Sequence, residues 1–303
     1  MGQFNADITI TEQRNETSLH IDTLPIYDIV ALMNKEDKSV ALAVESALPQ
    51  ISAAVEAIAA AVKQGGRLFY IGAGTSGRLG ILDASECPPT YGVAPELVVG
   101  IIAGGSAAIT RSIENAEDDP EAGRRDITAV ITAKDVLVGI ASSGTTPYVL
   151  GALAEAKRIG AITVGLSCNT NTPISAASDY AIEVPVGPEI VTGSTRLKAG
   201  TATKMVLNMM STATMIQLGK VYGNLMVNVQ ATNAKLRKRV VKIVMEATGA
   251  DEATAAAYSQ EANGDARIAI LMLKMGITAE QAAGALEQMN GHFGNTVHLL
   301  ETQ

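Results

Sequence analysis

The chain has 303 residues, enough for one large α/β domain and a small second domain. Its 23 basic and 31 acidic side chains give a net charge of −8, which argues against general nucleic-acid binding, because that function needs a basic face. Two cysteines, Cys87 and Cys168, form neither a disulfide framework nor a zinc-binding spacing. The polar N-terminus and the lack of an apolar run of about 18 residues indicate no signal peptide and no membrane span, so we expect a cytoplasmic protein.

A helical pattern precedes the first strand. From Ser39 to Val62 apolar residues recur every three or four positions, and the glycines at 65 and 66 end the pattern. Pro49 lies inside this stretch and has no N–H to donate. The sequence therefore predicts a helix that is kinked or broken near Pro49.

Strands and helices alternate over the next part of the chain. Apolar strands are expected at residues 67–71, 97–103, 136–141, 161–166 and 180–184, with helical segments between them. Such alternation is typical of a parallel sheet whose two faces are covered by helices. We therefore predict a three-layer α/β fold.

The last third of the chain is predicted to be helical. A segment rich in Ala, Met and Leu favours one long helix from after Ser194 to about Thr232, and the basic run at 235–242 fits a solvated helix face. Three short helical patterns then lie between residues 250 and 300, punctuated by glycines at 264, 276 and 291. We expect a division into residues 1–55, 56–232 and 233–303, the last being a small helical domain.

Two strand-to-helix junctions, at residues 72–77 and 142–147, are rich in glycine and hydroxyl groups. Their candidate phosphate ligands are Thr75, Ser76, Ser142, Ser143 and Thr145. Ligands of parallel sheets bind at such junctions, and the N–H groups of a helix N-terminus suit a phosphate dianion. Each junction could instead be an ordinary tight turn, since Gly, Ser and Thr are common there. Two of them after different strands favour a phosphate-ester site.

Neither junction makes a convincing nucleotide-binding site. The first has the glycine spacing of the dinucleotide motif, at Gly72, Gly74 and Gly77, but no acidic residue is clearly placed to hold a ribose, and no Gly-Lys-Ser/Thr sequence is present. The histidines at 20, 292 and 298 lack the spacing of metal ligands. We expect neither a nucleotide cofactor nor a metal site.

Several stretches resemble the N-acetylmuramic acid 6-phosphate etherase family, whose fold is the sugar isomerase (SIS) domain. They are Thr11–Asn15, Tyr70–Arg78, Leu82–Thr90, Ile102–Gly105, Glu114–Asp118 and Gly187–Thr201. The resemblance covers nearly the whole chain, and the Ser-Glu-Cys-Pro-Pro-Thr sequence at 85–90 is its most specific part. The C-terminal segment is similar to small three-helix ubiquitin-associated-like domains.

This resemblance implies a lyase that converts its substrate and water into N-acetylglucosamine 6-phosphate and D-lactate without a cofactor. The ether oxygen is β to the aldehyde carbon of the open sugar, so loss of the C2 proton lets lactate leave, and water then adds to the unsaturated aldehyde. Glu86 matches the family's proton donor to the lactyl oxygen, a role that partial burial would suit. Glu117 matches its second catalytic acid, assigned here to C2 proton abstraction. The sequence leaves open which is acid and which is base, and each could be a plain surface carboxylate.

Further substrate contacts follow from the same resemblance. Glu189, Ser194 and Thr195 are expected to reach sugar hydroxyls or the phosphate. Arg196 and Lys198 are candidates for the lactyl carboxylate, because an anion in a partly dry site needs a cationic partner; the alternative is that they are helix-surface charges. SIS domains usually pair, so we expect a homodimer with its sites near the interface, with a small-molecule sugar phosphate as its ligand and no nucleic-acid or membrane partner.

Two rival functions fit the same fold. A non-catalytic sugar-phosphate-binding regulator would keep the hydroxyl loops without needing both Glu86 and Glu117. An aldose–ketose isomerase would share C2 proton removal, but it would need neither an acid at the O3 side nor a group that binds a carboxylate. Release of D-lactate separates the lyase from both.

Overall fold

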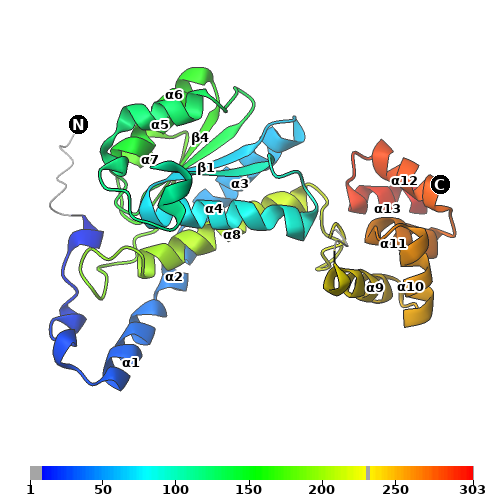
Figure 1. Cartoon of the computed structure of the whole chain (residues 1–303), viewed down its shortest axis with the longest axis horizontal. Coiled ribbons are helices and arrows are strands. Elements are labelled where there is room, and N and C mark those ends of the chain that lie inside the picture. The colour runs from blue at the N-terminus through cyan, green and yellow to red at the C-terminus, as the bar shows by residue number, and fades with distance from the viewer. Residues whose placement is uncertain (1–8, 230–232, 303) are drawn as a thin grey trace. The chain divides into compact units, whose positions relative to one another are not determined.

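The computed structural model describes residues 9–229 and 233–302 (Figure 1). Contacts group them into two compact units. One comprises the described residues of Met1–Ser85 with Glu96–Ser211, and the other comprises Glu86–Pro95 with the described residues of Thr212–Gln303. The predicted domain boundary at residue 55 stays a prediction, and the one at residue 232 lies outside the described residues.

The first unit begins with short helices. These are the 3-10 helices η2 (Ile10–Glu12), η3 (Glu16–Ser18) and η4 (Ile21–Thr23), followed by α1 (Ile26–Asp37), α2 (Val40–Ser46) and α3 (Leu48–Lys63). The predicted break is confirmed: Pro49 lies in the first turn of α3, where a backbone N–H has no partner inside the helix. In the described ranges no single helix is long and apolar enough to cross a membrane; α1 to α3 meet that test only as a pair bent by 59°.

The central sheet has five parallel strands, as predicted. They are β1 (Leu68–Gly72), β2 (Val98–Ile102), β3 (Val136–Ile140), β4 (Ile162–Ser167) and β5 (Tyr180–Glu183). The spatial order is β2-β1-β3-β4-β5. Every residue of β1 and β3 is buried, as expected for central strands covered on both faces.

Helices form the two outer layers. α5 (Pro120–Thr128) and α6 (Pro147–Ile159) cover the face that carries Phe69, with which they share a core cluster. α4 (Gly74–Tyr91) and α8 (Lys198–Gln217) cover the opposite face, where Tyr70 Oη donates to Asp83 Oδ2 of α4 at 2.9 Å and Asn208 Nδ2 of α8 donates to Asp83 Oδ1 at 2.7 Å. Phe69 and Tyr70 point to opposite faces because strand side chains alternate. The predicted three-layer α/β fold is confirmed.

Three short helices complete this layer structure, η5 (Gly105–Ile109), η6 (Ala116–Asp118) and α7 (Pro173–Ala177). One prediction was wrong in extent: the long Ala/Met/Leu-rich helix ends at Gln217 and not near residue 232. Gly219 follows with φ +70°, a left-handed conformation that ends a helix. Residues 230–232 lie outside the described part of the chain.

The second unit has its own helical core. Its helices are α9 (Ala234–Thr248), α10 (Glu252–Glu261), α11 (Ala266–Met275), α12 (Ala279–Gln288) and α13 (Phe293–Glu301). The helical C-terminal segment is confirmed, but residues 250–300 hold four helices where three were predicted, because the three glycines are the breaks between them. The basic run lies exposed on α9, as predicted.

Candidate functional site

The two hydroxyl-rich junctions follow neighbouring strands. β1 pairs with β3, and Gly72 at the end of β1 is level with Ile140 at the end of β3. After β1 the chain passes to β2, on one side of this pair, and after β3 it passes to β4, on the other side. In parallel sheets with this strand order, ligands bind in the crevice where the order reverses, outside the carboxyl ends of the strands. Both junctions therefore border the expected ligand crevice.

Close packing fixes the first junction. A Cβ on Gly72 would lie 2.7 Å from Gly77 N, and one on Gly77 would lie 2.6 Å from Ile102 Cγ1, so glycine is required at both positions. α4 begins at Gly74, and Thr75 and Ser76 occupy its first turn. Thr75 is half-buried and Ser76 is buried. Because the first N–H groups of a helix have no partner inside it, this turn can receive an anion.

The second junction holds its hydroxyl groups through internal hydrogen bonds. Thr145 donates to Ser143 Oγ from its N at 3.2 Å and from its Oγ1 at 3.0 Å. Ser142, Ser143 and Thr145 are all half-buried, and α6 begins two residues later. The carbonyl oxygen of Ser142 accepts from Cys168 N at 3.0 Å, which ties this loop to the end of β4.

Asn169 is a positioning residue that sequence reasoning missed. It is buried, and its Nδ2 donates to Ser142 O at 3.0 Å and to Ser143 O at 3.4 Å. The same amide exchanges two hydrogen bonds with Thr11 of η2. Asn169 thus joins the N-terminal segment to the second hydroxyl loop. Its place just after β4, at the sheet edge that carries the other loops, was the signal that could have found it.

Glu117 lines a cavity of about 180 Å³ beside the first junction. The lining residues are Ala73, Gly74, Arg78, Ala103, Ala108, Arg111, Ser112, Ile113, Glu114, Asn115, Ala116 and Glu117. Glu117 lies in η6, which packs against α6. The structure therefore brings Glu117 together with the start of α4, and the role of Glu117 as a base stays a prediction.

Two arginines lie beside the two glutamates in the lining of this cavity. Arg78 of α4 donates from Nε to Ile109 O at 2.9 Å and from Nη2 to Arg111 O at 3.0 Å, so it holds the segment that leads to Glu117. Arg111 is exposed, and its guanidinium makes no hydrogen bond or ion pair with any described residue. Arg111 was also missed by sequence reasoning, and it is free to meet an anion in the cavity.

Glu86 lies further along α4. Its side chain is exposed, so the partial burial expected for a proton donor is not found within the single chain. The part of α4 that lines the Glu117 cavity ends at Arg78. The role of Glu86 as an acid stays a prediction.

Glu189 and Lys198 organise the start of α8. Glu189 is fully buried, and its Oε2 and Oε1 accept from Lys198 N at 3.0 Å and Ala199 N at 2.9 Å. Burial raises the pKa of the Glu189 carboxyl. Lys198 Nζ donates to Glu36 Oε2 at 2.8 Å, and this bond lowers the pKa of Glu36. The substrate contacts predicted for Glu189 and Lys198 stay predictions, since these partners from the same chain already engage both side chains.

The segment before α8 lies near the first junction. A Cβ on Gly200 would lie 3.6 Å from Thr75 Cγ2, so the starts of α4 and α8 meet. Ser194 and Thr195 are half-buried there. Arg196 is exposed and lines a separate cavity of about 150 Å³ together with Glu36 and Lys198 of the ion pair.

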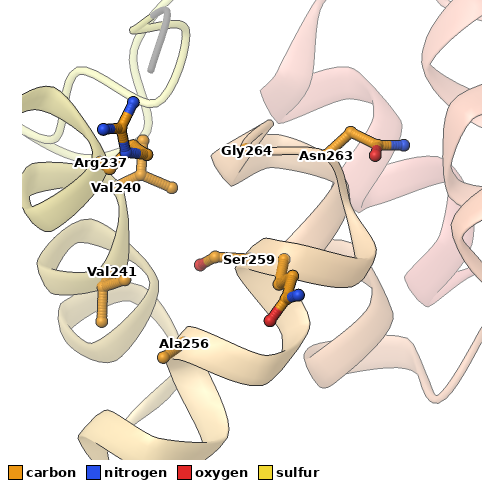
Figure 2. Close-up of a pocket in the computed structure, with 8 residues that line it drawn as sticks. Arg237, Val240, Val241, Ala256, Ser259, Asn263 and Gly264 are labelled. Carbon is orange, nitrogen blue, oxygen red and sulfur yellow. The ribbon is translucent and has the colours of Figure 1, made fainter. Parts of the chain in front are cut away.

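The second unit contains a cavity of about 320 Å³ between α9 and α10 (Figure 2). Val240, Val241 and Ala256 give it an apolar wall, and Arg237 is the one charged residue in its lining. It offers no carboxylate for proton transfer. Within the described ranges, no group of three or more His, Cys, Asp or Glu is arranged to hold a metal ion.

Two family models match parts of this chain. The SIS domain model matches residues 108–213, and the model of the glucokinase regulatory protein N-terminal SIS domain matches residues 50–157. The phosphoheptose isomerase of Neisseria gonorrhoeae is 20% identical with a TM-score of 0.49, covering 63% of this chain and 99% of that one.

Curated relatives match at much higher identity. The N-acetylmuramic acid 6-phosphate etherase of Aeromonas hydrophila subsp. hydrophila is 56% identical over 290 residues, covering 95% of this chain and 97% of that protein. The protein of the same name from Photobacterium profundum is 57% identical over 283 residues, covering 93% and 94%. The chain belongs to the N-acetylmuramic acid 6-phosphate etherase family.

Proposed function

We propose that this protein cleaves the D-lactyl ether of N-acetylmuramic acid 6-phosphate, giving N-acetylglucosamine 6-phosphate and D-lactate. The observation that carries this proposal is the convergence of two hydroxyl loops and the Glu117 cavity at the β1–β3 crevice of a chain whose relatives bear this name. The products belong to the recycling of cell-wall sugars, and a cytoplasmic location fits that role.

The phosphate is held by uncharged groups. Thr75 and Ser76 offer hydroxyls at the start of α4, and Ser142, Ser143 and Thr145 offer them from the neighbouring junction. Hydroxyls and helix N-terminal N–H groups donate to a dianion without adding a fixed charge. Phosphate binding by these groups leaves C2 and C3 of the open sugar near Glu117.

The reaction needs two proton transfers in each half. Glu117 takes the C2 proton, the C3–O bond breaks, and Glu86 gives its proton to the departing lactate oxygen, which leaves an unsaturated aldehyde. Water then adds at C3: Glu86 takes a proton from the water, and Glu117 returns one to C2. The protons balance over the two halves, so both glutamates end as they began.

Arg111 is our candidate for the lactyl carboxylate. It lines the cavity of Glu117, and its guanidinium is unengaged within the described structure. A guanidinium binds a carboxylate through two parallel hydrogen bonds. Arg196 remains a second candidate, whereas Lys198 already pairs with Glu36.

A homodimer is the expected assembly. Several large apolar side chains are exposed in the single chain, among them Ile26 and Tyr27 of α1, at 80% and 81%, and Leu82 of α4, at 49%. Exposed apolar surface of this kind marks contact sites. Pairing of two copies covers it without a second type of partner.

The direct test measures D-lactate released from N-acetylmuramic acid 6-phosphate, with Glu86→Gln and Glu117→Gln variants beside the wild type. We expect lactate from the wild type only. In deuterium oxide, Glu86→Gln should still exchange the C2 proton, whereas Glu117→Gln should not, because C2 abstraction does not need the acid.

A regulator remains the second candidate because a regulatory protein's SIS domain matches residues 50–157. It would bind the phosphosugar tightly and release no lactate. Tight binding by a wild type that leaves the ether intact would replace the lyase with the regulator.

A further inference from the structure

Lys220 of the second unit carries an ammonium group without a carboxylate partner. It lies just after the end of α8 and is half-buried, and its Nζ forms no ion pair or hydrogen bond with a residue in the described ranges. Burial and the positive charge of Arg267 lower the pKa of the Lys220 ammonium. A cation that is partly withdrawn from water and left unpaired is costly, so its surroundings favour a bound anion.

Arg267 of α11 lies close to Lys220. A Cβ on Gly291 would lie 3.9 Å from Lys220 Nζ and 3.9 Å from Arg267 Nη1, so the two cationic groups flank the same glycine. Nε and Nη2 of Arg267 donate to the Asp265 carboxylate at 3.0 and 2.6 Å, which leaves Nη1 without an acceptor among the residues that the structure describes. Asp265 balances only one of the two cations, so the cluster keeps a net positive charge.

The start of α13 adds to this positive region. The first N–H of the helix, at Phe293, donates to Gly219 O at 3.2 Å, which holds the residue before Lys220 against the helix start. Gly291 lies two residues before Phe293 in the chain. The N-terminal end of a helix carries a partial positive charge. Two cationic side chains and a helix N-terminus therefore surround Gly291.

Arg267 also lines a polar cavity of about 260 Å³, together with Asn228, Asn263 and Asp265. Asn228 is only 7% exposed, and its Nδ2 donates to Tyr91 O. Its Oδ1 is buried and receives no hydrogen bond from the described part of the chain. An unpaired buried acceptor costs free energy, so the cavity favours a ligand whose hydroxyl group can donate to Asn228.

We propose that the second unit binds a small hydroxylated anion: its carboxylate or phosphate group lies between Lys220 and Arg267, and its hydroxyl group donates to Asn228 Oδ1. Arg267 links the two parts of the site, because it flanks Gly291 and lines the cavity of Asn228. All these residues belong to the second unit, so the site contains none of the hydroxyl loops of the first. D-lactate and N-acetylglucosamine 6-phosphate both combine an anionic group with hydroxyls. The inference does not depend on the lyase reaction.

Nuclear magnetic resonance of the full chain, with lysines methylated by a ¹³C label, observes the site at Lys220 itself. The signals of Lys220 and Lys238 are identified by their loss in Lys220→Arg and Lys238→Arg. D-lactate or N-acetylglucosamine 6-phosphate should shift the Lys220 signal until it saturates. The signal of Lys238, an exposed lysine of α9, should not move and is the matched control. A saturable shift with one compound only identifies that compound as the source of the ligand, whereas no such shift with either contradicts the proposal.

Two further probes test the hydroxyl contact. Propionate and methyl phosphate keep the anionic groups of lactate and the sugar phosphate but lack their hydroxyls. Whichever hydroxylated compound binds, its matching probe should bind at least about tenfold more weakly, the effect of leaving the Asn228 oxygen unpaired. Asn228→Leu should remove this preference, because it deletes the acceptor. Equal affinities of the wild type for a hydroxylated compound and its matching probe would overturn the assignment, and that comparison needs no variant.

Discussion

Asn169 and Thr11 are joined by a reciprocal pair of hydrogen bonds across 158 residues of sequence. Thr11 N donates to Asn169 Oδ1 at 3.2 Å, and Asn169 Nδ2 donates to Thr11 Oγ1 at 2.9 Å. Because the same Nδ2 also donates to the carbonyls of Ser142 and Ser143, the N-terminal segment and the second hydroxyl loop share one buried anchor.

Replacing that anchor should loosen the loop. Asn169→Ala leaves buried backbone groups without partners, so we expect a loss of about 1–3 kcal/mol in the free energy of unfolding and a higher KM for the phosphosugar. Thr11→Val is the matched control, because it keeps the shape and removes one of the two bonds with Asn169, costing about 1 kcal/mol. Urea unfolding and steady-state kinetics report both; an Asn169→Ala protein equal to the wild type in stability and KM contradicts the anchor role.

Glu189 should give the protein a specific pH dependence. Burial raises the pKa of its carboxyl above the ordinary 4.5. At pH values between 4.5 and this raised pKa, the folded state holds a proton that the unfolded state has lost. This contribution is fully present below pH 4.5 and is lost as the pH rises through the raised pKa. The stability of the wild type relative to Glu189→Gln should therefore shrink from pH 4 to pH 7. A difference that grows with pH would show that the sign is wrong.

The ion pair of Glu36 and Lys198 should make the stability depend on pH in the direction opposite to that of Glu189. The hydrogen bond from Lys198 lowers the pKa of Glu36, so its contribution is present above pH 4.5 and is lost as the pH falls through the lowered pKa. The side chains of Glu36 and Lys198 are only 16% and 5% exposed. Lys198→Met should lower the free energy of unfolding by about 3–5 kcal/mol at pH 7, because it leaves the Glu36 carboxylate without its cationic partner. The double variant Glu36→Gln/Lys198→Met should cost less than the sum of the single changes. Simple additivity would mean that the two groups do not interact.

Recognition of the lactyl carboxylate can be separated from recognition of the phosphosugar. Arg111→Met should raise the Kd for N-acetylmuramic acid 6-phosphate about 10–100-fold, the effect of losing a charge-assisted hydrogen bond, measured in a Glu86→Gln background to prevent turnover. Binding of N-acetylglucosamine 6-phosphate, which lacks the lactyl group, should not change. The same comparison with Arg196→Met is the control; a selective loss there and not at Arg111 would exchange the two assignments.

Local signals predicted much of this molecule. The five strands, the break at Pro49 and the exposed basic face of α9 follow from periodicity and backbone chemistry, which act over a few residues. The end of α8 was misjudged because composition alone did not reveal the left-handed Gly219. Asn169 with Thr11, and Lys198 with Glu36, lie far apart in sequence, so only the folded chain shows that they are partners.

The most direct test of the central claim is the fate of solvent oxygen. Incubated with N-acetylmuramic acid 6-phosphate in ¹⁸O-labelled water, the wild-type protein should place the label on C3 of N-acetylglucosamine 6-phosphate and leave D-lactate unlabelled, because elimination breaks the bond between C3 and the ether oxygen. Mass spectrometry of both products reads the outcome. Label in D-lactate would mean that the bond on the lactyl side breaks, and elimination between two glutamates could not then be the reaction.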